Sequence, residues 1–290
     1  MLGALMGDFI GSAYEFKPVK TKDFLLVSSR SRFTDDSVLT CAVAMATMNY
    51  IDLLLRNNHY THDEATYKMM VTKYIQSWAL VYPHAGYGGK FRRWVESGSS
   101  EPYGSFGNGS AMRVSSIGWL FNNIADVELV AKWSAEVTHN TEEGVKAAQA
   151  VAGAIFLSRT ENINKKNRIK KYISNYGYNL DRTVDSIRPN YKFDATCQGS
   201  VPEAIICFLE SNSYTDAVKN AVSLGGDADT QAAIAGSIAE AYYSEEYTNI
   251  DPEFNFTRGQ VINAMDSTMK YVLECFDRYM GKANMPDLKC

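Results

Sequence analysis

The sequence lacks the features that mark several large classes of protein. Basic side chains are not in excess: 29 Lys and Arg against 33 Asp and Glu give a net charge of −4, which argues against binding nucleic acid by charge alone. No apolar run approaches the length needed to span a bilayer. No basic segment precedes the first apolar residues, and Asp8 interrupts them, so no signal peptide is predicted. We therefore expect a cytoplasmic protein without a membrane or a stable nucleic-acid partner.

Cysteine and histidine motifs are also missing. The five cysteines are scattered, and none forms a C-x-x-C pair. This excludes a disulfide framework at this chain length and predicts reduced thiols. The H-E-x-x-H pattern is absent, which argues against a zinc site.

Patterns typical of β-strands are nearly absent as well. Apolar and polar residues seldom alternate, whereas apolar residues recur at helical spacing from end to end. No linker, low-complexity tract or repeat divides the 290 residues. We predict an all-α fold in a single compact domain, residues 1–290, that exists as a monomer.

Helical spacing also predicts individual helices. Gly3, Gly7 and Gly11 lie on one face of the first helix, which indicates close packing against that face. Further helices are expected over residues 111–121, over residues 198–210 with Pro202 at the start, and over residues 258–280.

The most informative side chains stand at two helix starts. They are Thr34, Asp35 and Asp36 in the first cluster and Asp227, Asp229 and Thr230 in the second. The second cluster precedes a helix whose packed face is mostly Ala and Gly. Taken singly, either cluster is explained as an acidic N-cap.

Taken together, the clusters predict a metal centre. Two such helix starts facing each other would gather four carboxylates and two hydroxyls, and a divalent cation relieves the repulsion between them. Ligands that are all oxygen suit Mg²⁺ or Mn²⁺. Two cations about 4 Å apart would orient a substrate diol and activate water.

Three other features point to a ligand or to chemistry. Residues 103–110 contain three glycines, an Asn and two serines, so their backbone amides can converge on an anion, although a plain turn has the same composition. No Lys-Ser/Thr follows, which excludes a P-loop. His139 lies at a helix cap, where a structural role is the alternative. Glu15 is two turns from Asp8 on the same face, and a solvated surface charge is the alternative.

In this order, the motifs resemble those of the ADP-ribosylglycohydrolase family. They are Gly7-Asp8 with Gly11 and Glu15, residues 33–36, residues 104–113, Thr138-His139, and residues 225–230. The resemblance covers nearly the whole chain. It implies an orthogonal helical bundle with two Mg²⁺ ions, for which Mn²⁺ is a substitute. It further implies a hydrolase that cleaves the bond at the anomeric carbon of ADP-ribose, on a modified protein or a small ADP-ribose conjugate.

The resemblance also implies roles for single residues. The implied metal ligands are Thr34, Asp35, Asp36, Asp227, Asp229 and Thr230. The implied ADP-ribose-binding residues are Gly104, Ser105, Phe106, Gly107, Asn108 and His139, with Phe106 against the adenine. Glu15 is the implied catalytic carboxylate, and Asp35 is the other candidate for handling the proton.

Two residues depart from the family pattern, and two other functions stay open. Ser37 stands where Thr is usual, and Glu240 stands where a small residue is frequent. Another dinuclear hydrolase, such as a phosphoesterase, is one alternative function. A non-catalytic ADP-ribose-binding protein on the same fold is the other, although such a protein has no need of six metal ligands.

Overall fold

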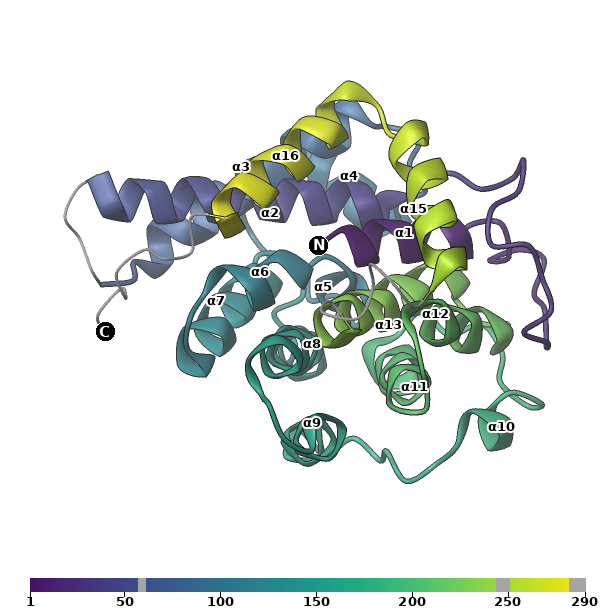
Figure 1. The fold of residues 1–290 in the computed structure, drawn as a ribbon. Helices are drawn as coiled ribbons and strands as arrows, with labels where there is room; N and C mark the ends of the chain where they lie inside the picture. The colour runs from purple at the N-terminus through teal and green to yellow at the C-terminus, as the bar shows by residue number, and fades with distance from the viewer. Residues whose placement is uncertain (57–60, 244–250, 282–290) are drawn as a thin grey trace.

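The structure is a computed structural model that describes residues 1–56, 61–243 and 251–281 (Figure 1). The helices of the first half are α1 (Leu2–Gly11), α2 (Asp35–Arg56), α3 (Glu64–Val81), α4 (Gly89–Ser97), α5 (Gly109–Met112), α6 (Ser115–Leu120), α7 (Ile124–Glu136) and α8 (Glu142–Thr160). Those of the second half are α9 (Lys165–Ser174), α10 (Val184–Ile187), α11 (Cys197–Leu209), α12 (Tyr214–Ser223), α13 (Ala228–Tyr243), α15 (Pro252–Ala264) and α16 (Ser267–Gly281). The described residues contain no β-strand, so the all-α prediction is confirmed.

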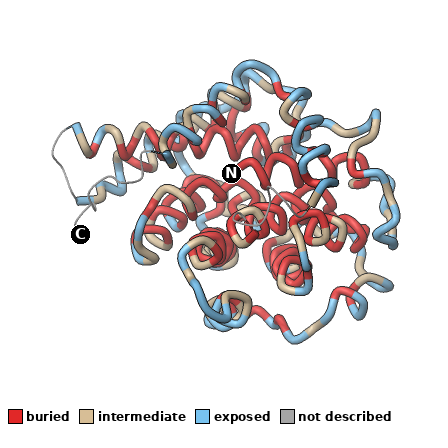
Figure 2. Tube along the Cα trace, viewed as in Figure 1, coloured by how far each residue is buried: buried red, intermediate tan, exposed pale blue. Residues whose placement is uncertain are grey.

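Helix α13 forms the centre of the molecule. Nearly all its residues are buried, and it packs against α1, α8, α11 and α12. Figure 2 shows a buried interior here, with the exposed residues on outer helices and loops. A helix that is apolar on every side belongs in a core, and the small side chains of α13 let its neighbours approach closely.

The glycines of α1 make the closest of these contacts. A Cβ atom on Gly7 would lie 2.1 Å from the backbone oxygen of Ala232, and one on Gly11 would lie 2.3 Å from that of Ala228. Gly3 makes a similar approach to the same helix. No side chain fits at these distances, so the predicted close packing of this face is confirmed. It fixes the end of α1 against the start of α13.

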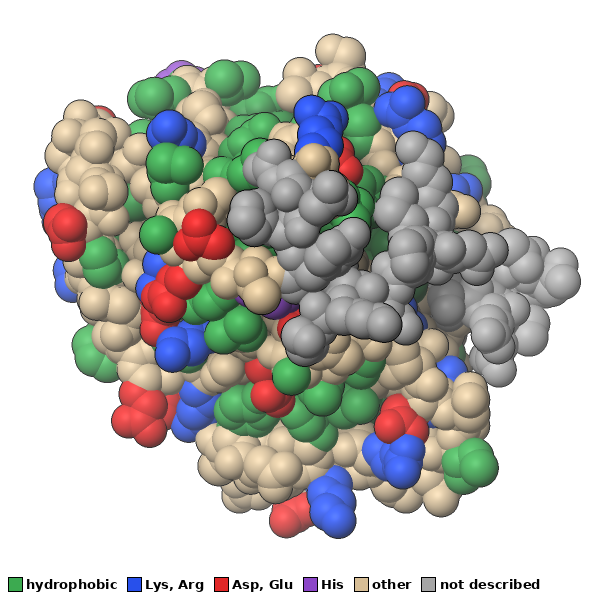
Figure 3. Space-filling model, turned by 90° about the vertical axis from the view of Figure 1, so that its left-hand side faces the viewer, with side chains coloured by type: hydrophobic (Ala, Val, Ile, Leu, Met, Phe, Trp, Pro, Cys, Tyr) green, Lys and Arg blue, Asp and Glu red, His purple; other side chains and the backbone are tan. Residues whose placement is uncertain are grey.

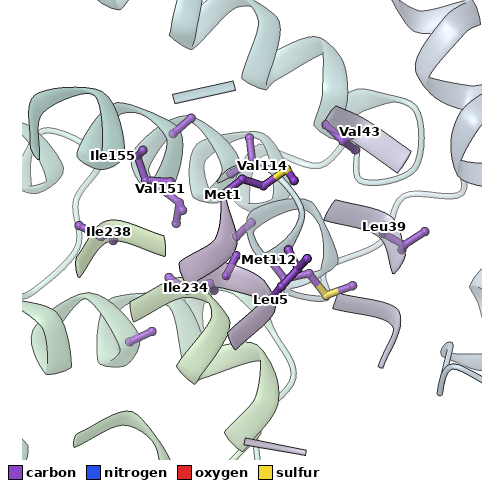
Figure 4. Packing of buried hydrophobic residues seen from close by; sticks show 14 of the residues in the cluster. Met1, Leu5, Leu39, Val43, Met112, Val114, Val151, Ile155, Ile234 and Ile238 are labelled. Atoms are coloured by element: carbon purple, nitrogen blue, oxygen red, sulfur yellow. The ribbon is translucent and has the colours of Figure 1, made fainter. Parts of the chain in front are cut away.

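Larger apolar side chains fill the space around this helix pair. Figure 4 shows side chains of several helices in one cluster, with Leu5 of α1, Met112 of α5 and Ile234 of α13 labelled near its centre. None of these three residues is more than 5% exposed. Burying a side chain of this size typically contributes about 1.5–3 kcal/mol relative to exposure.

Two expected helices are each divided into two. The helix expected over residues 111–121 is interrupted at Arg113, whose backbone leaves the helical region and whose buried side chain reaches α7 and the turn after it. The helix expected over residues 258–280 is α15 followed by α16. Met265 is extended between them, and the Asp266 side chain accepts a hydrogen bond from the backbone N–H of Met269. In both places, polar contacts of a side chain interrupt a helix that the spacing of apolar residues predicts to be continuous.

The start of α11 also differs from the prediction. Pro202 lies inside the helix and not at its start, because the Thr196 side chain accepts a hydrogen bond from Gly199 N and begins the helix earlier. The short helix α10 was not anticipated; a Thr183–Ser186 capping box holds it.

Helix α2 corrects the statement about apolar length. By length and composition alone, Asp35–Arg56 would be long and apolar enough to cross a bilayer, but 72% of its apolar window is buried inside the protein. It therefore meets the description of a core helix. On the face shown in Figure 3, acidic and basic side chains are interspersed and form no large field of one sign.

Candidate active site

The structure brings the two acidic clusters together. Asp35 and Asp36 are in the first turn of α2, and Asp229 and Thr230 are in the first turn of α13. The Thr230 hydroxyl donates to Asp36 Oδ2 over 3.2 Å, which joins the two helix starts directly. Because both helix N-termini converge, their exposed N–H groups favour negative charge between them.

A further carboxylate lies beneath this junction. Asp8 of α1 is completely buried and accepts hydrogen bonds from Thr34 N (2.9 Å), Thr34 Oγ1 (2.6 Å) and Ser37 N (3.1 Å). The Ser37 hydroxyl also donates to Asp8. Serine therefore supplies the same donor as the threonine that is usual at this position, without its methyl group. Oxygens of Asp8, Asp36 and Asp229 lie within 4.8 Å of one another. Since both Asp8 oxygens already accept hydrogen bonds, we assign Asp8 to holding the start of α2.

Glu15 completes the acidic group from another side. It follows α1 in a turn, not on the helix itself, which ends at Gly11. A Glu15 oxygen lies within 4.8 Å of oxygens of Asp227 and Asp229. The glycine contact between α1 and α13 is what brings this turn to the start of α13.

Burial and mutual repulsion change the acidity of these groups. Burial, followed by the charge of Asp229, raises the pKa of Glu15 to about 8. The same two causes raise the pKa of Asp35 to about 8. Burial raises the pKa of Asp227 to about 6 and holds that of Asp36 and Asp229 well above the ordinary value. Without a cation, several of these carboxyls therefore hold protons near neutral pH.

The oxygen atoms present fit a hard divalent cation. Asp36 Oδ1 is buried and has no hydrogen-bond partner among the described residues, which is costly for a carboxylate unless something else binds it. Its neighbours are carboxylates and hydroxyls with neither nitrogen nor sulfur among the clustered ligand atoms. This donor set suits Mg²⁺ or Mn²⁺ and not a thiophilic metal.

A cavity of about 400 Å³ opens above the acidic group. Such a volume lies within the usual range for small-molecule sites. Predicted site residues that line it are Glu15, Asp35, Asp36, Ser105, Gly107, Asn108, His139, Asp227, Asp229 and Thr230. The structure thus gathers both acidic clusters and much of the glycine-rich loop around one space.

Three predicted residues do not line this cavity. Thr34 is buried below the floor, where it bonds to Asp8. Gly104 is in the left-handed region (φ 61°), which favours glycine, and it turns the chain into the loop. The side chain of Phe106 is 56% exposed on the outside of the loop.

The loop is fixed to both neighbouring segments. Asn108 Nδ2 donates to Asp227 Oδ2 over 2.8 Å and to Ser200 Oγ over 3.0 Å, linking the loop to the acidic floor. Ser105 N, Gly107 N and Asn108 N donate to the Thr138 carbonyl, the Ser105 hydroxyl and the Ala195 carbonyl. These three amides already donate hydrogen bonds within the protein. Fewer backbone amides are therefore available to bind an anion than the glycine content of the loop predicts.

Some cavity residues were missed by the sequence analysis. Tyr103 and Phe193 line the cavity, and Phe193 is 55% exposed. Tyr103 is the first residue of the glycine-rich loop, so its position was a usable signal. Phe193 follows α10 in a stretch without a motif, and no local pattern indicated it. Arg113 also lines the cavity, as the last residue of the motif that begins at Gly104.

The chain is similar in sequence to known proteins. The family model described as ADP-ribosylglycohydrolase matches residues 1–254. The chain is 25% identical to ADP-ribosylhydrolase ARH3 of Gallus gallus, over 85% of this chain and 84% of the relative. It is 25% identical to ADP-ribosylarginine hydrolase Tri1 of Pseudomonas putida, over 84% of this chain and 69% of that one.

A solved structure has a similar fold. It is described as an ADP-ribosylglycohydrolase-related protein complex and superposes with a TM-score of 0.65 at 19% identity, covering 98% of this chain and 97% of the other. At that identity the match speaks for the fold alone. Given the family match over most of its length, the chain belongs to the ADP-ribosylglycohydrolase family.

Proposed function

We propose that this protein is a metal-dependent hydrolase that cleaves the glycosidic bond at the anomeric carbon of ADP-ribose. The observation that carries the proposal is the convergence of the α2 and α13 starts, with Glu15, at the floor of one cavity. The glycine-rich loop forms another wall of that cavity. A nucleotide sugar bound along this loop would place its terminal ribose near the carboxylates.

The ligands proposed for two Mg²⁺ ions, with Mn²⁺ as a substitute, lie on two chain segments. They are Thr34, Asp35, Asp36, Asp227, Asp229 and Thr230. When bound, such ions supply an acidified water and a fixed position for the ribose hydroxyls. Asp8 and Asn108 would hold this set in place, because each contacts a proposed ligand through short hydrogen bonds.

The proton of the attacking water needs a carboxylate acceptor. Glu15 and Asp35 both line the cavity, and each can accept a proton in its ionised form. Glu15 differs from Asp35 in lying on the turn after α1, apart from both helix starts. We favour Glu15 as the catalytic carboxylate and keep Asp35 as a metal ligand that could also serve as the base.

The proposed substrate is an ADP-ribosylated protein or a small ADP-ribose conjugate. We propose that Ser105, Gly107, Asn108 and His139 bind it, with Gly104 shaping the loop. Phe106 is proposed to contact the adenine from the outer side of the loop. One relative is named for arginine linkages, so an arginine-linked substrate belongs in any test.

A panel of substrates with defined linkages tests the proposal. The purified protein is incubated with arginine-linked, serine-linked and acetate-linked ADP-ribose, with Mg²⁺ or with EDTA, and the products are separated by mass spectrometry. Release of intact ADP-ribose only with Mg²⁺ is expected for at least one linkage. Phosphate release would favour the phosphoesterase alternative. Tight ADP-ribose binding with no turnover on any linkage would favour a non-catalytic binder.

A further inference from the structure

A buried arginine stands beside the proposed ligand cavity without an acidic partner. Arg113 is 0% exposed, and no carboxylate among the described residues forms a salt bridge with it. Its Nη2 donates to the Ser134 carbonyl and to the Thr138 hydroxyl, over 2.8 Å in each case. Burial lowers the pKa of Arg113 to about 10, so the group still carries its charge at neutral pH. A buried cation without an anion is unusual.

The contact with Thr138 determines where the threonine proton points. A guanidinium only donates hydrogen bonds, so Thr138 Oγ1 must accept from Arg113. The hydroxyl keeps one proton of its own to donate. The ring nitrogen Nδ1 of His139 lies 2.7 Å away, and it is the one acceptor recorded for that proton in the described part of the chain. The Arg113 contact therefore favours a relay that runs in one direction, from guanidinium to hydroxyl to imidazole.

The direction of the relay selects the histidine tautomer. If Nδ1 accepts, the ring proton of a neutral imidazole must be on Nε2. Burial, with the nearby Arg113 charge, holds the pKa of His139 well below its ordinary value, so the ring is neutral at physiological pH. Nε2 is directed toward the glycine-rich loop: a Cβ on Gly109 would lie 3.2 Å from it, and one on Gly107 would lie 3.8 Å away.

The loop has need of such a donor. Its amides at Ser105, Gly107 and Asn108 already donate within the protein. A histidine protonated on Nδ1 would present a lone pair to the cavity and repel the oxygens of a bound anion. A histidine protonated on Nε2 presents an N–H group that only donates.

We propose that Arg113 and Thr138 are positioning residues that hold His139 as the neutral Nε2–H tautomer, a fixed hydrogen-bond donor to an oxygen of bound ADP-ribose. This rests on the proposed function for the identity of the ligand. The tautomer itself is a property of the free protein. Arg113 also adds a positive charge beside the cavity, which favours an anionic ligand.

Nitrogen NMR on protein labelled with ¹⁵N-histidine tests the relay directly. The sequence has four histidines, so the spectrum is simple, and the His139→Asn variant assigns the signals. The expected wild-type result at neutral pH is a protonated Nε2 and an unprotonated Nδ1 on His139. A wild-type His139 protonated on Nδ1 would overturn the proposal.

Two substitutions at Thr138 separate positioning from simple packing. Thr138→Val keeps the shape and removes the hydroxyl, whereas Thr138→Ser keeps the hydroxyl and removes a methyl. Thr138→Val should lower the fraction of the Nε2–H tautomer and weaken ADP-ribose binding in proportion, so that a fraction of about one tenth gives roughly tenfold weaker binding. Thr138→Ser should keep the wild-type tautomer and stay within about twofold of wild-type affinity.

Calorimetry with ADP-ribose, and the Mg²⁺-induced rise in melting temperature, complete the test. That rise should be the same in both variants, which shows that each is folded. Equal affinity of Thr138→Val and wild type would overturn the role of the relay in binding. If the wild type shows the expected tautomer but binds no ADP-ribose, the proposed function fails and the relay stands as a structural finding only.

Discussion

Hydrogen-bond donors distinguish single carboxylates at this site that are equally buried. Asp8 accepts hydrogen bonds at both oxygens, whereas Asp36 has one oxygen with no partner in the part of the chain that the structure describes. The two side chains are of the same type and lie close together, yet one is fully satisfied and the other is open to a cation. The difference comes from which backbone amides face each group.

The raised pKa values predict how pH affects stability. Glu15 and Asp35 have a pKa of about 8 in the folded, metal-free protein, above the ordinary values of 4.5 and 3.8. The folded state therefore holds more protons than the unfolded state between about pH 4 and pH 8, and its stability falls as the pH rises through that range. We expect the melting temperature of the EDTA-treated protein to be several degrees lower at pH 8 than at pH 5.

The stabilisation by added Mg²⁺ should have the opposite pH dependence. Metal ligands must be deprotonated, so the rise in melting temperature on adding millimolar Mg²⁺ should be larger at pH 8 than at pH 5. Scanning calorimetry at both pH values, with Mg²⁺ and with EDTA, measures the effect. A melting temperature that does not respond to Mg²⁺ at pH 8 would count against the metal centre.

Variants of Glu15 and Asp229 should respond differently to added metal. Glu15→Gln keeps the shape but removes the base, so kcat should fall by about 10²–10⁴-fold while the Mg²⁺ dependence stays the same. Asp229→Asn should shift the Mg²⁺ dependence to higher concentration and recover part of its activity with excess Mg²⁺ or Mn²⁺. Near wild-type kcat for Glu15→Gln at saturating metal and substrate would move the base to Asp35.

At the scale of elements, the helix pair α1 and α13 is the critical contact. It joins the turn that carries Glu15 to the helix start that carries Asp229, and its closeness depends on glycine. Because the site needs oxygens from both helices at short range, any wider spacing between them would separate the carboxylates.

Gly7→Ala tests this contact. The new methyl would meet a backbone oxygen at 2.1 Å, and overpacking of this kind typically costs about 1–3 kcal/mol or more. The control is Gly259→Ala in α15, where a Cβ meets no described atom within 4 Å; there alanine should stabilise by roughly 0.5–1 kcal/mol. Urea denaturation measures both, and equal stability of Gly7→Ala and wild type would show that the helices can adjust.

The glycine-rich loop is the second element to test. In Gly107→Val, the added Cβ would lie 3.3 Å from Ser105 Oγ and 3.5 Å from the Ala195 carbonyl, and the branched methyls would add further bulk on the cavity side. We expect weaker ADP-ribose binding by calorimetry with an unchanged Mg²⁺-induced rise in melting temperature. Unchanged affinity would mean that the loop is a plain turn.

For the whole molecule, helical period and motif order were sufficient to predict the all-α fold and the meeting of the two acidic clusters. The interruptions at Arg113 and Met265 were not predictable from period, because single buried or capping side chains override the apolar pattern there. Asp8 appeared only as part of a motif. Its support of Thr34 depends on a contact between segments 26 residues apart, which local spacing does not encode.

The contacts of Ser37 and Glu240 could not be predicted from local sequence either. Each departs from the usual family residue, and the sequence offered no reason. In the structure the Ser37 hydroxyl bonds to Asp8, and the Glu240 carboxylate lies 2.6 Å from the amino group of Met1. Both partners are distant in sequence, so neither departure could be explained before the fold was known.

The pairing of α1 with α13 also has a consequence for the newly made chain. Roughly two hundred residues lie between these helices, and at a synthesis rate of about 5–20 residues per second the ribosome needs about ten seconds or more to make them. Throughout that interval the glycine face of α1 has no native partner. The acidic cluster of α2 is likewise without its counterpart until Asp229 and Thr230 leave the ribosome. Assembly of the complete acidic group is therefore a late event, because it must wait until residues 227–230 have been translated.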